Sequence, residues 1–165
     1  MSKIGTIKFG EDVNTNGISV SIYFTSCDFN CKNCFNKEFQ NYNYGFEFTK
    51  EIKNNIFKYI ENNVNYIDNL AILGGEPLHK NNIINVINLC KEFKLKFPNK
   101  NIWLWTGYEF ENIPNKNIID VTDCIIDGLF IESLKDRHLK YRGSNNQRIF
   151  KNGKLILDNE IDLQN

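Results

Sequence analysis

Residues 18–34 of the chain read ISVSIYFTSCDFNCKNC and join an apolar, alternating segment directly to three closely spaced cysteines. Ile18 to Phe24 alternate apolar with polar side chains and include β-branched and aromatic types, which is typical of a β-strand. Cys27, Cys31 and Cys34 follow in a C-x3-C-x2-C spacing. We therefore expect a strand that delivers three thiols to one loop at its C-terminal end.

Further strands and helices alternate along the chain beyond this loop. Thr49 can cap a helix over residues 50–63, in which apolar side chains recur every four residues on one face. Pro98 stops a second amphipathic segment, because proline cannot continue a helix. The other predicted elements are a strand at 70–73, a helix at 81–97, strands at 101–106 and 124–127, and a hairpin across Asn152-Gly153.

This alternation predicts an α/β fold in a single domain spanning residues 1–165. Polar or glycine residues follow each predicted strand, at the edge where parallel α/β folds build their active sites. A closed (β/α)8 barrel takes about 250 residues, so this chain has room for about five or six units. We expect an incomplete (β/α) barrel that ends in a C-terminal β-hairpin. Its open side would leave a lateral entrance for a macromolecular substrate.

Composition excludes several classes of function. The 20 basic and 20 acidic residues cancel and are interspersed, so no charged block would bind nucleic acid or an anionic membrane. No apolar run approaches the ~20 residues that span a bilayer, and the N-terminal segment lacks the apolar core of a signal peptide. Five cysteines, three of them in one loop, suit metal ligation in a reducing compartment better than disulfides. We expect a cytoplasmic protein.

The three clustered cysteines admit two kinds of metal site. A cubane iron–sulfur cluster takes thiolate ligands from a short loop of this kind. Neither Cys90 nor Cys124 has the local spacing of a fourth ligand, so one iron would stay open for a substrate. The alternative is a zinc site, which would need a remote partner such as His79 because zinc prefers four nitrogen or sulfur ligands.

The three-cysteine loop after the first predicted strand resembles the signature of the radical S-adenosylmethionine superfamily. The resemblance implies one 4Fe-4S cluster on Cys27, Cys31 and Cys34, with its open iron chelated by the methionine part of S-adenosylmethionine. An electron passed through such a cluster cleaves the sulfonium C–S bond and yields a 5'-deoxyadenosyl radical. Many members carry an aromatic residue just before the third cysteine, whereas this chain has Asn33 there and Phe35 just after.

A second motif, Gly74-Gly75-Glu76-Pro77, lies at the end of the predicted strand at 70–73. Glycines let a backbone approach a ligand closely, and a glutamate can accept a hydrogen bond from an ammonium group. The motif resembles the superfamily's GGEP sequence, which implies that it binds the amino group of the methionine part. Taken alone, the Gly-Gly pair would favour an ordinary strand-to-helix turn, and the functional interpretation depends on its combination with the cysteine loop.

A finer resemblance covers nearly the whole chain and is to the small activating enzyme of anaerobic ribonucleotide reductase, a glycyl-radical activase. It rests on residues 34–36 (CFN), 105–108 (WTGY), 127–130 (DGLF) and 142–148 (RGSNNQR). The resemblance implies that the chain cleaves S-adenosylmethionine to place a glycyl radical on that reductase. It also implies a low-potential electron donor such as flavodoxin or ferredoxin.

The same resemblance implies cofactor-binding roles for five residues outside the two motifs' cores: Phe35, Asn36, Thr106, Tyr108 and Asp127. Several of these have a structural alternative. Thr106 could cap a turn, and Asp127 could fix the turn at Gly128 rather than bind a ribose hydroxyl.

Other residues near these motifs are assigned no part in the site. Trp103 and Trp105 are expected to pack within a strand, and Cys90 within the core. Arg142 and Arg148 receive no role. Two alternative functions stay open: a radical enzyme acting on a small molecule, such as a 7-carboxy-7-deazaguanine synthase, and a non-catalytic zinc or iron–sulfur module.

Overall fold

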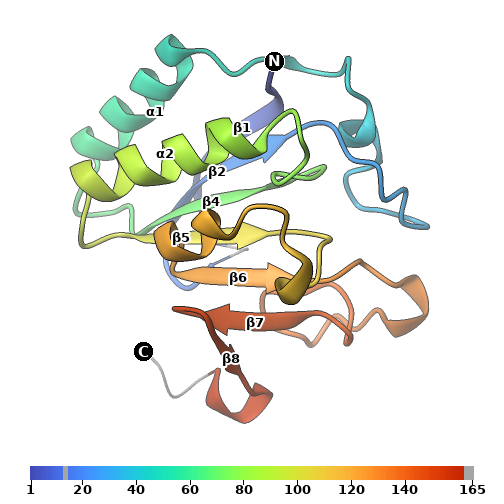
Figure 1. The fold of residues 1–165 in the computed structure, drawn as a ribbon. Helices are drawn as coiled ribbons and strands as arrows, with labels where there is room; N and C mark the ends of the chain where they lie inside the picture. The colour runs from blue at the N-terminus through green and yellow to red at the C-terminus, as the bar shows by residue number, and fades with distance from the viewer. Residues whose placement is uncertain (13–14, 162–165) are drawn as a thin grey trace.

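The computed structural model describes residues 1–12 and 15–161, which form an eight-stranded sheet in the order β3-β1-β2-β4-β5-β6-β7-β8 (Figure 1). The strands are β1 (Lys3–Glu11), β2 (Ser19–Phe24), β3 (Phe46–Glu47), β4 (Asn69–Gly74), β5 (Asn101–Trp105), β6 (Cys124–Asp127), β7 (Arg148–Lys151) and β8 (Lys154–Ile156). The α-helices are α1 (Lys50–Asn62) and α2 (Ile83–Lys96). The 3-10 helices are η1 (Lys37–Gln40), η2 (Phe110–Asn112), η3 (Lys116–Val121), η4 (Glu132–Leu134) and η5 (Asp158–Glu160).

The central strands β2, β4, β5 and β6 run parallel to one another. They are joined by crossovers through α1, α2 and η3. β1 pairs with β2, and β7 with β6, in antiparallel fashion. Because the central strands share one direction, the loops that follow them converge at one edge of the sheet, on the right in Figure 1. The cysteine loop follows β2 and the Gly-Gly-Glu-Pro motif follows β4.

Both α-helices pack on the same face of the sheet (Figure 1). The Thr49 hydroxyl accepts a hydrogen bond from the Ile52 N–H and caps α1, as its sequence predicts. On this face Ile56 and Ile60 of α1 and Val86 of α2 join the buried core, together with strand residues such as Ile22. Because successive side chains of a strand point to opposite faces of the sheet, every second strand residue lies on the face without helices.

That opposite face carries two smaller buried clusters. Tyr23, Ala71 and Leu73 form one of them with Phe39, and the other contains Trp103, Cys124, Ile126 and Ile149. Cys90 lies fully buried in the core on the helical face, as predicted. No helix in the described part of the chain is long and apolar enough to cross a bilayer.

The predicted elements are present close to their expected bounds, and the terminal hairpin is confirmed. Asn152 and Gly153 turn with positive φ angles of 49° and 75°, the geometry that an Asn-Gly hairpin favours. The chain length leaves room for about five or six β/α units, and the described residues contain three parallel crossovers, of which two pass through α-helices. The incomplete barrel itself stays a prediction.

Candidate functional site

A cavity of about 180 Å³ lies at the edge where the parallel strands end. Cys27, Cys31 and Cys34 all line it, although Cys90 and Cys124 do not. Its other walls come from the loops after β4, β5 and β6 and include Gly74, Gly75, Glu76, Thr106, Gly107, Gly128 and Phe130. Motifs from residue 27 to residue 147 of the sequence therefore meet around the three thiols.

The cysteine loop adopts a backbone that few residue types accept. Ser26, Asn30 and Asn33 have φ angles of 74°, 48° and 53°, in the left-handed region. Asparagine is the non-glycine residue that enters this region most readily, and here it directly precedes the second and the third cysteine. The Asn33 amide also donates to Glu132. These turns direct the three thiols toward a common cavity.

The thiols are partly exposed. Burial raises the pKa of Cys27 to about 11 and also raises the pKa of Cys31. A metal overcomes this preference for the neutral thiol, because iron and zinc bind the thiolate and release its proton. Within residues 1–12 and 15–161, no three His, Cys, Asp or Glu side chains are grouped around a single metal-ion position, whereas Cys27, Cys31 and Cys34 line one cavity, as thiolates bound to different irons of one cluster would.

His79, the remote ligand of the zinc alternative, has other partners. One ring nitrogen lies 3.2 Å from a carboxylate oxygen of Asp28, and the other accepts a hydrogen bond from the Asn81 N–H. Both nitrogens that could bind a metal are therefore already in hydrogen bonds.

Gly74 and Gly75 are required by the chain's own backbone. Gly74 has a φ of 120°, and a Cβ there would lie 2.3 Å from the Phe24 carbonyl oxygen. A Cβ on Gly75 would lie 2.5 Å from the carbonyl oxygen of Phe39. The sequence interpretation explained these glycines by close approach to a ligand. The structure adds a close approach between β4 and its neighbours, which leaves no room for a side chain.

Glu76 connects the loops after β4 and β5. Its side chain is buried, and its carboxylate accepts hydrogen bonds from the Leu78 N–H, the Thr106 hydroxyl and the Gly107 N–H, each at 2.8 Å. Burial raises the pKa of this carboxyl to about 7, against the effect of the three donors, which lower it. Glu76 lines the cavity, and when ionised it keeps acceptor capacity beyond these three bonds, because two carboxylate oxygens offer about four acceptor sites.

Three further residues predicted from the sequence contact the loops that form the cavity. The Asn36 amide donates to the Gly74 carbonyl at 3.1 Å and lines the cavity. Phe35, 66% exposed, stands at its rim with its ring centroid 5.0 Å from that of Phe130. Thr106 donates to Glu76 and accepts from the Tyr108 N–H, which is the turn-capping role considered as its alternative.

Tyr108 and Asp127 are not among the residues that line the cavity. The Tyr108 ring packs edge-on against Phe29, at 4.9 Å between centroids. Asp127 is buried and accepts from the Phe110 N–H and from the guanidinium of Arg148. These contacts give Asp127 a structural role, and its contact with a ribose stays a prediction.

The two arginines without an assigned role are both structural. Arg148 bridges Asp127 and Glu111, and these two acids raise its pKa. Arg142 donates to the Gln147 carbonyl and to Asp158. Arg142 thus connects the segment before β7 to η5, and Arg148, the first residue of β7, connects that strand to β6 and η2.

Sequence reasoning missed several residues that line the cavity, including Phe29, Trp105 and Gln147. Trp105 ends β5, and its indole N–H donates to the Tyr141 carbonyl at 2.8 Å. Its position at the end of a parallel strand was the signal that could have identified it. Gln147 accepts from the Gly143 and Ser144 N–H groups and donates to the Gly128 carbonyl, which only the folded loop reveals.

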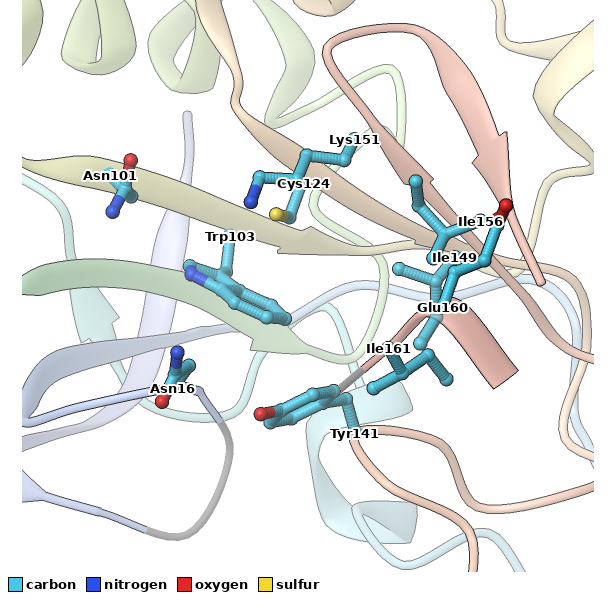
Figure 2. Close-up of a pocket in the computed structure, with 10 residues that line it drawn as sticks. All are labelled: Asn16, Asn101, Trp103, Cys124, Tyr141, Ile149, Lys151, Ile156, Glu160 and Ile161. Carbon is cyan, nitrogen blue, oxygen red and sulfur yellow. The ribbon is translucent and has the colours of Figure 1, made fainter. Parts of the chain in front are cut away.

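A larger cavity of about 300 Å³ lies on the sheet face opposite the helices. Figure 2 shows Trp103 at its centre, with Tyr141 beside it and the side chains of Ile149, Ile156 and Ile161 together at one end. Cys124 is the single thiol that lines it. This cavity lacks the clustered thiols and Glu76, so the smaller cavity is the candidate site for metal and cofactor chemistry.

The left-handed backbone of the cysteine loop gives a first testable prediction. Asn33→Val should destabilise the folded conformation of the loop by about 1–2 kcal/mol, since a β-branched side chain is poorly accommodated at positive φ. Asn33→Gly should be tolerated. Lys32→Val places the same side chain on the neighbouring residue, where φ is not positive, and is the matched control. Iron retained after a fixed exposure to chelator measures the effect, and equal retention in both valine variants would contradict the argument.

Comparison with known proteins agrees with this geometry. Residues 13–150 match the family model of a 4Fe-4S single cluster domain. The chain is 38% identical to the anaerobic ribonucleoside-triphosphate reductase-activating protein of Enterobacteria phage T4, over 85% of this chain and 88% of the relative. It is 32% and 31% identical to the proteins of that name from Salmonella typhimurium and Escherichia coli K12, over 82% of this chain and 89% of each.

The family match and the cysteine loop thus define an iron–sulfur protein with a single 4Fe-4S cluster domain. Within that class, the chain belongs to the family of the anaerobic ribonucleoside-triphosphate reductase-activating proteins. This membership favours the activase over a deazaguanine synthase and over a zinc module.

Proposed function

We propose that this chain activates an anaerobic ribonucleotide reductase by cleaving S-adenosylmethionine reductively. One electron from an external donor cleaves the sulfonium C–S bond and releases methionine. One hydrogen atom from a glycine Cα of the reductase then completes 5'-deoxyadenosine, and the glycine is left as a stored radical. The observation that carries this proposal is the cavity in which three thiols from the loop after β2 meet Glu76 from the loop after β4.

Different residues of the cavity would bind the cluster and S-adenosylmethionine. Cys27, Cys31 and Cys34 would hold three irons of the cluster and leave one open. When bound, the cluster supplies the low-potential electron that reduces the sulfonium. Glu76, held by its three donors, would accept the methionine ammonium group, and the apolar rings of Phe35 and Trp105 would border the remaining space.

The reductase would complete this site. Phe35 and Leu129 are exposed at the rim, so the chain alone does not close the cavity from water. A reactive carbon radical takes hydrogen from almost any nearby C–H bond, and an ordered complex with one glycine loop is therefore a condition of selectivity. In this proposal the sheet is an incomplete barrel, and the face opposite the helices is its interior.

A low-potential protein such as flavodoxin or ferredoxin would supply the electron. A thiolate-ligated cluster has a low potential, so its reduction needs a donor of comparable potential. The five cysteines, all free thiols, suit a reducing compartment, and we place the reaction in the cytoplasm.

The reduced, cluster-loaded protein should generate a glycyl radical on the reductase from the same source when S-adenosylmethionine is added. Electron paramagnetic resonance detects this radical as a doublet, and the Cys34→Ala variant serves as the inactive control. Formation of 5'-deoxyadenosine without the reductase should be slow, because the unassisted site lacks its hydrogen donor. A reductase that stays free of radical while a small heterocycle is turned over would contradict the proposal.

A further inference from the structure

The loop that carries the cysteines and the loop that carries Glu76 are joined by backbone and amide hydrogen bonds where they begin. The Gly75 N–H donates to the Phe24 carbonyl and the Glu76 N–H to the Ser26 carbonyl, at 2.7 and 3.0 Å. The buried Asn82 amide donates to the carbonyls of Thr25 and Glu76, at 2.7 and 2.9 Å. These bonds end at residue 26, before the first cysteine.

The Asn36 amide joins the same two loops just after the third cysteine, and a contact of His79 extends the connection to the residue after the first cysteine. His79, 3% exposed, lies in the segment between β4 and α2, and its Nε2 is 3.2 Å from Oδ2 of Asp28. Asp28 directly follows Cys27 and so lies inside the C-x3-C spacing. The Tyr42 ring packs on the imidazole at 5.3 Å between centroids and restricts its orientation.

The direction of this hydrogen bond follows from the other ring nitrogen. Nδ1 of His79 accepts a bond from the Asn81 backbone N–H, which can only donate. Nδ1 therefore carries the lone pair, and in the neutral imidazole the proton resides on Nε2. The Nε2–H then donates to the Asp28 carboxylate, so the contact needs no charge on the histidine.

We propose that His79 is a positioning residue for the cluster. Through Asp28 it fixes the first turn of the cysteine loop against the Gly74–Glu76 loop, and it would thereby position a cluster held by the three cysteines relative to Glu76. Phe29, the residue after Asp28, packs against Gly107, where a Cβ would lie 2.6 Å from its ring. The inference rests on the proposed binding of S-adenosylmethionine by Glu76.

Variants at residue 79 test the contact. Gln places an amide N–H near the position of the histidine Nε2–H, whereas Leu keeps the bulk and removes the donor. We expect His79→Leu to speed hydrogen exchange in residues 27–34 of the cluster-free protein. It should still load the cluster but bind S-adenosylmethionine about three- to tenfold more weakly. It should also reduce the change that S-adenosylmethionine causes in the paramagnetic resonance spectrum of the reduced cluster, and His79→Gln should restore all three properties.

A double-mutant cycle separates positioning from a general loss of stability. Asp28→Ala, at a largely exposed side chain, should reproduce the effects of His79→Leu, and the two together should add nothing further. Lys94→Met is the matched control, because it breaks an ion pair with Asp123 near the opposite end of the sheet, at 2.7 Å. It should lower stability without changing affinity or spectrum.

Additive effects of Asp28→Ala and His79→Leu, or a His79→Gln variant as defective as His79→Leu, would overturn the inference. So would wild-type affinity and spectrum in His79→Leu. These outcomes leave the proposed function intact, because it fails on a different result, the lack of a glycyl radical with the wild-type chain.

Discussion

Each of the three single variants Cys27→Ala, Cys31→Ala and Cys34→Ala should abolish the 4Fe-4S cluster. Anaerobic reconstitution of the wild-type chain should load about four irons and four sulfides, and each of these three variants should lose the brown chromophore. The physical reason is that a loop with three thiolates has none to spare, and the other two thiols lie outside the cavity. Iron and sulfide analysis with visible absorption gives the measurement.

Cys90→Ala and Cys124→Ala are the controls for this experiment. Cys90 is fully buried in the core, and burial raises its pKa strongly. Burial also raises the pKa of Cys124 to about 12, and neither thiol lines the cavity in which Cys27, Cys31 and Cys34 meet. Both variants should keep the cluster. A requirement for either thiol, or a wild-type chain that binds one zinc tightly and rejects iron, would refute the three-ligand assignment.

The central elements were predictable because their signals are local. Alternation marks β2, a capping threonine and apolar residues four apart mark α1, and an Asn-Gly pair marks the hairpin of β7 and β8. β1 was missed for an equally local reason. Its pairing with β2 shifts register between Ile4 and Thr6 and again between Phe9 and Glu11, at the two glycines of the strand. Such bulges interrupt the period of two that reveals a strand.

The site was predictable only in part, because its supporting contacts are not local. The cysteine spacing and the Gly-Gly-Glu motif identify the two loops, and the direction of parallel strands brings them together. Thr106 and Gly107 donate hydrogen bonds to Glu76, and Arg148 forms an ion pair with Asp127. Each of these contacts joins residues more than twenty positions apart. No sequence period encodes such pairings.

Glu76 is the residue whose loss should affect cofactor binding most. Its carboxylate has two roles in the proposal: it accepts three donors of the chain and offers a remaining lone pair to the methionine ammonium. The bond to the ammonium is charge-assisted and worth about 1.5–3 kcal/mol. Glu76→Ala should therefore weaken S-adenosylmethionine binding about ten- to a hundredfold while the cluster still assembles.

Two further variants distinguish binding of the ammonium from support of the loops. Thr106→Val removes one donor to Glu76 but keeps the carboxylate, so it should cost stability and change affinity little. Glu76→Gln keeps the size but sets an amide N–H against the Gly107 or Leu78 N–H, and it should lose affinity nearly as fully as Glu76→Ala.

The pH dependence of binding gives an independent measurement of the same role. Burial holds the pKa of Glu76 at about 7, above its ordinary value of 4.5. An ammonium ligand favours the ionised carboxylate, so wild-type affinity for S-adenosylmethionine should increase as the pH rises through about 7. The Glu76→Gln variant has no such proton to release, and its affinity should lack that increase. Unchanged affinity in Glu76→Ala, together with the same pH profile in Glu76→Gln and wild type, would reduce Glu76 to a residue that only joins the loops after β4 and β5.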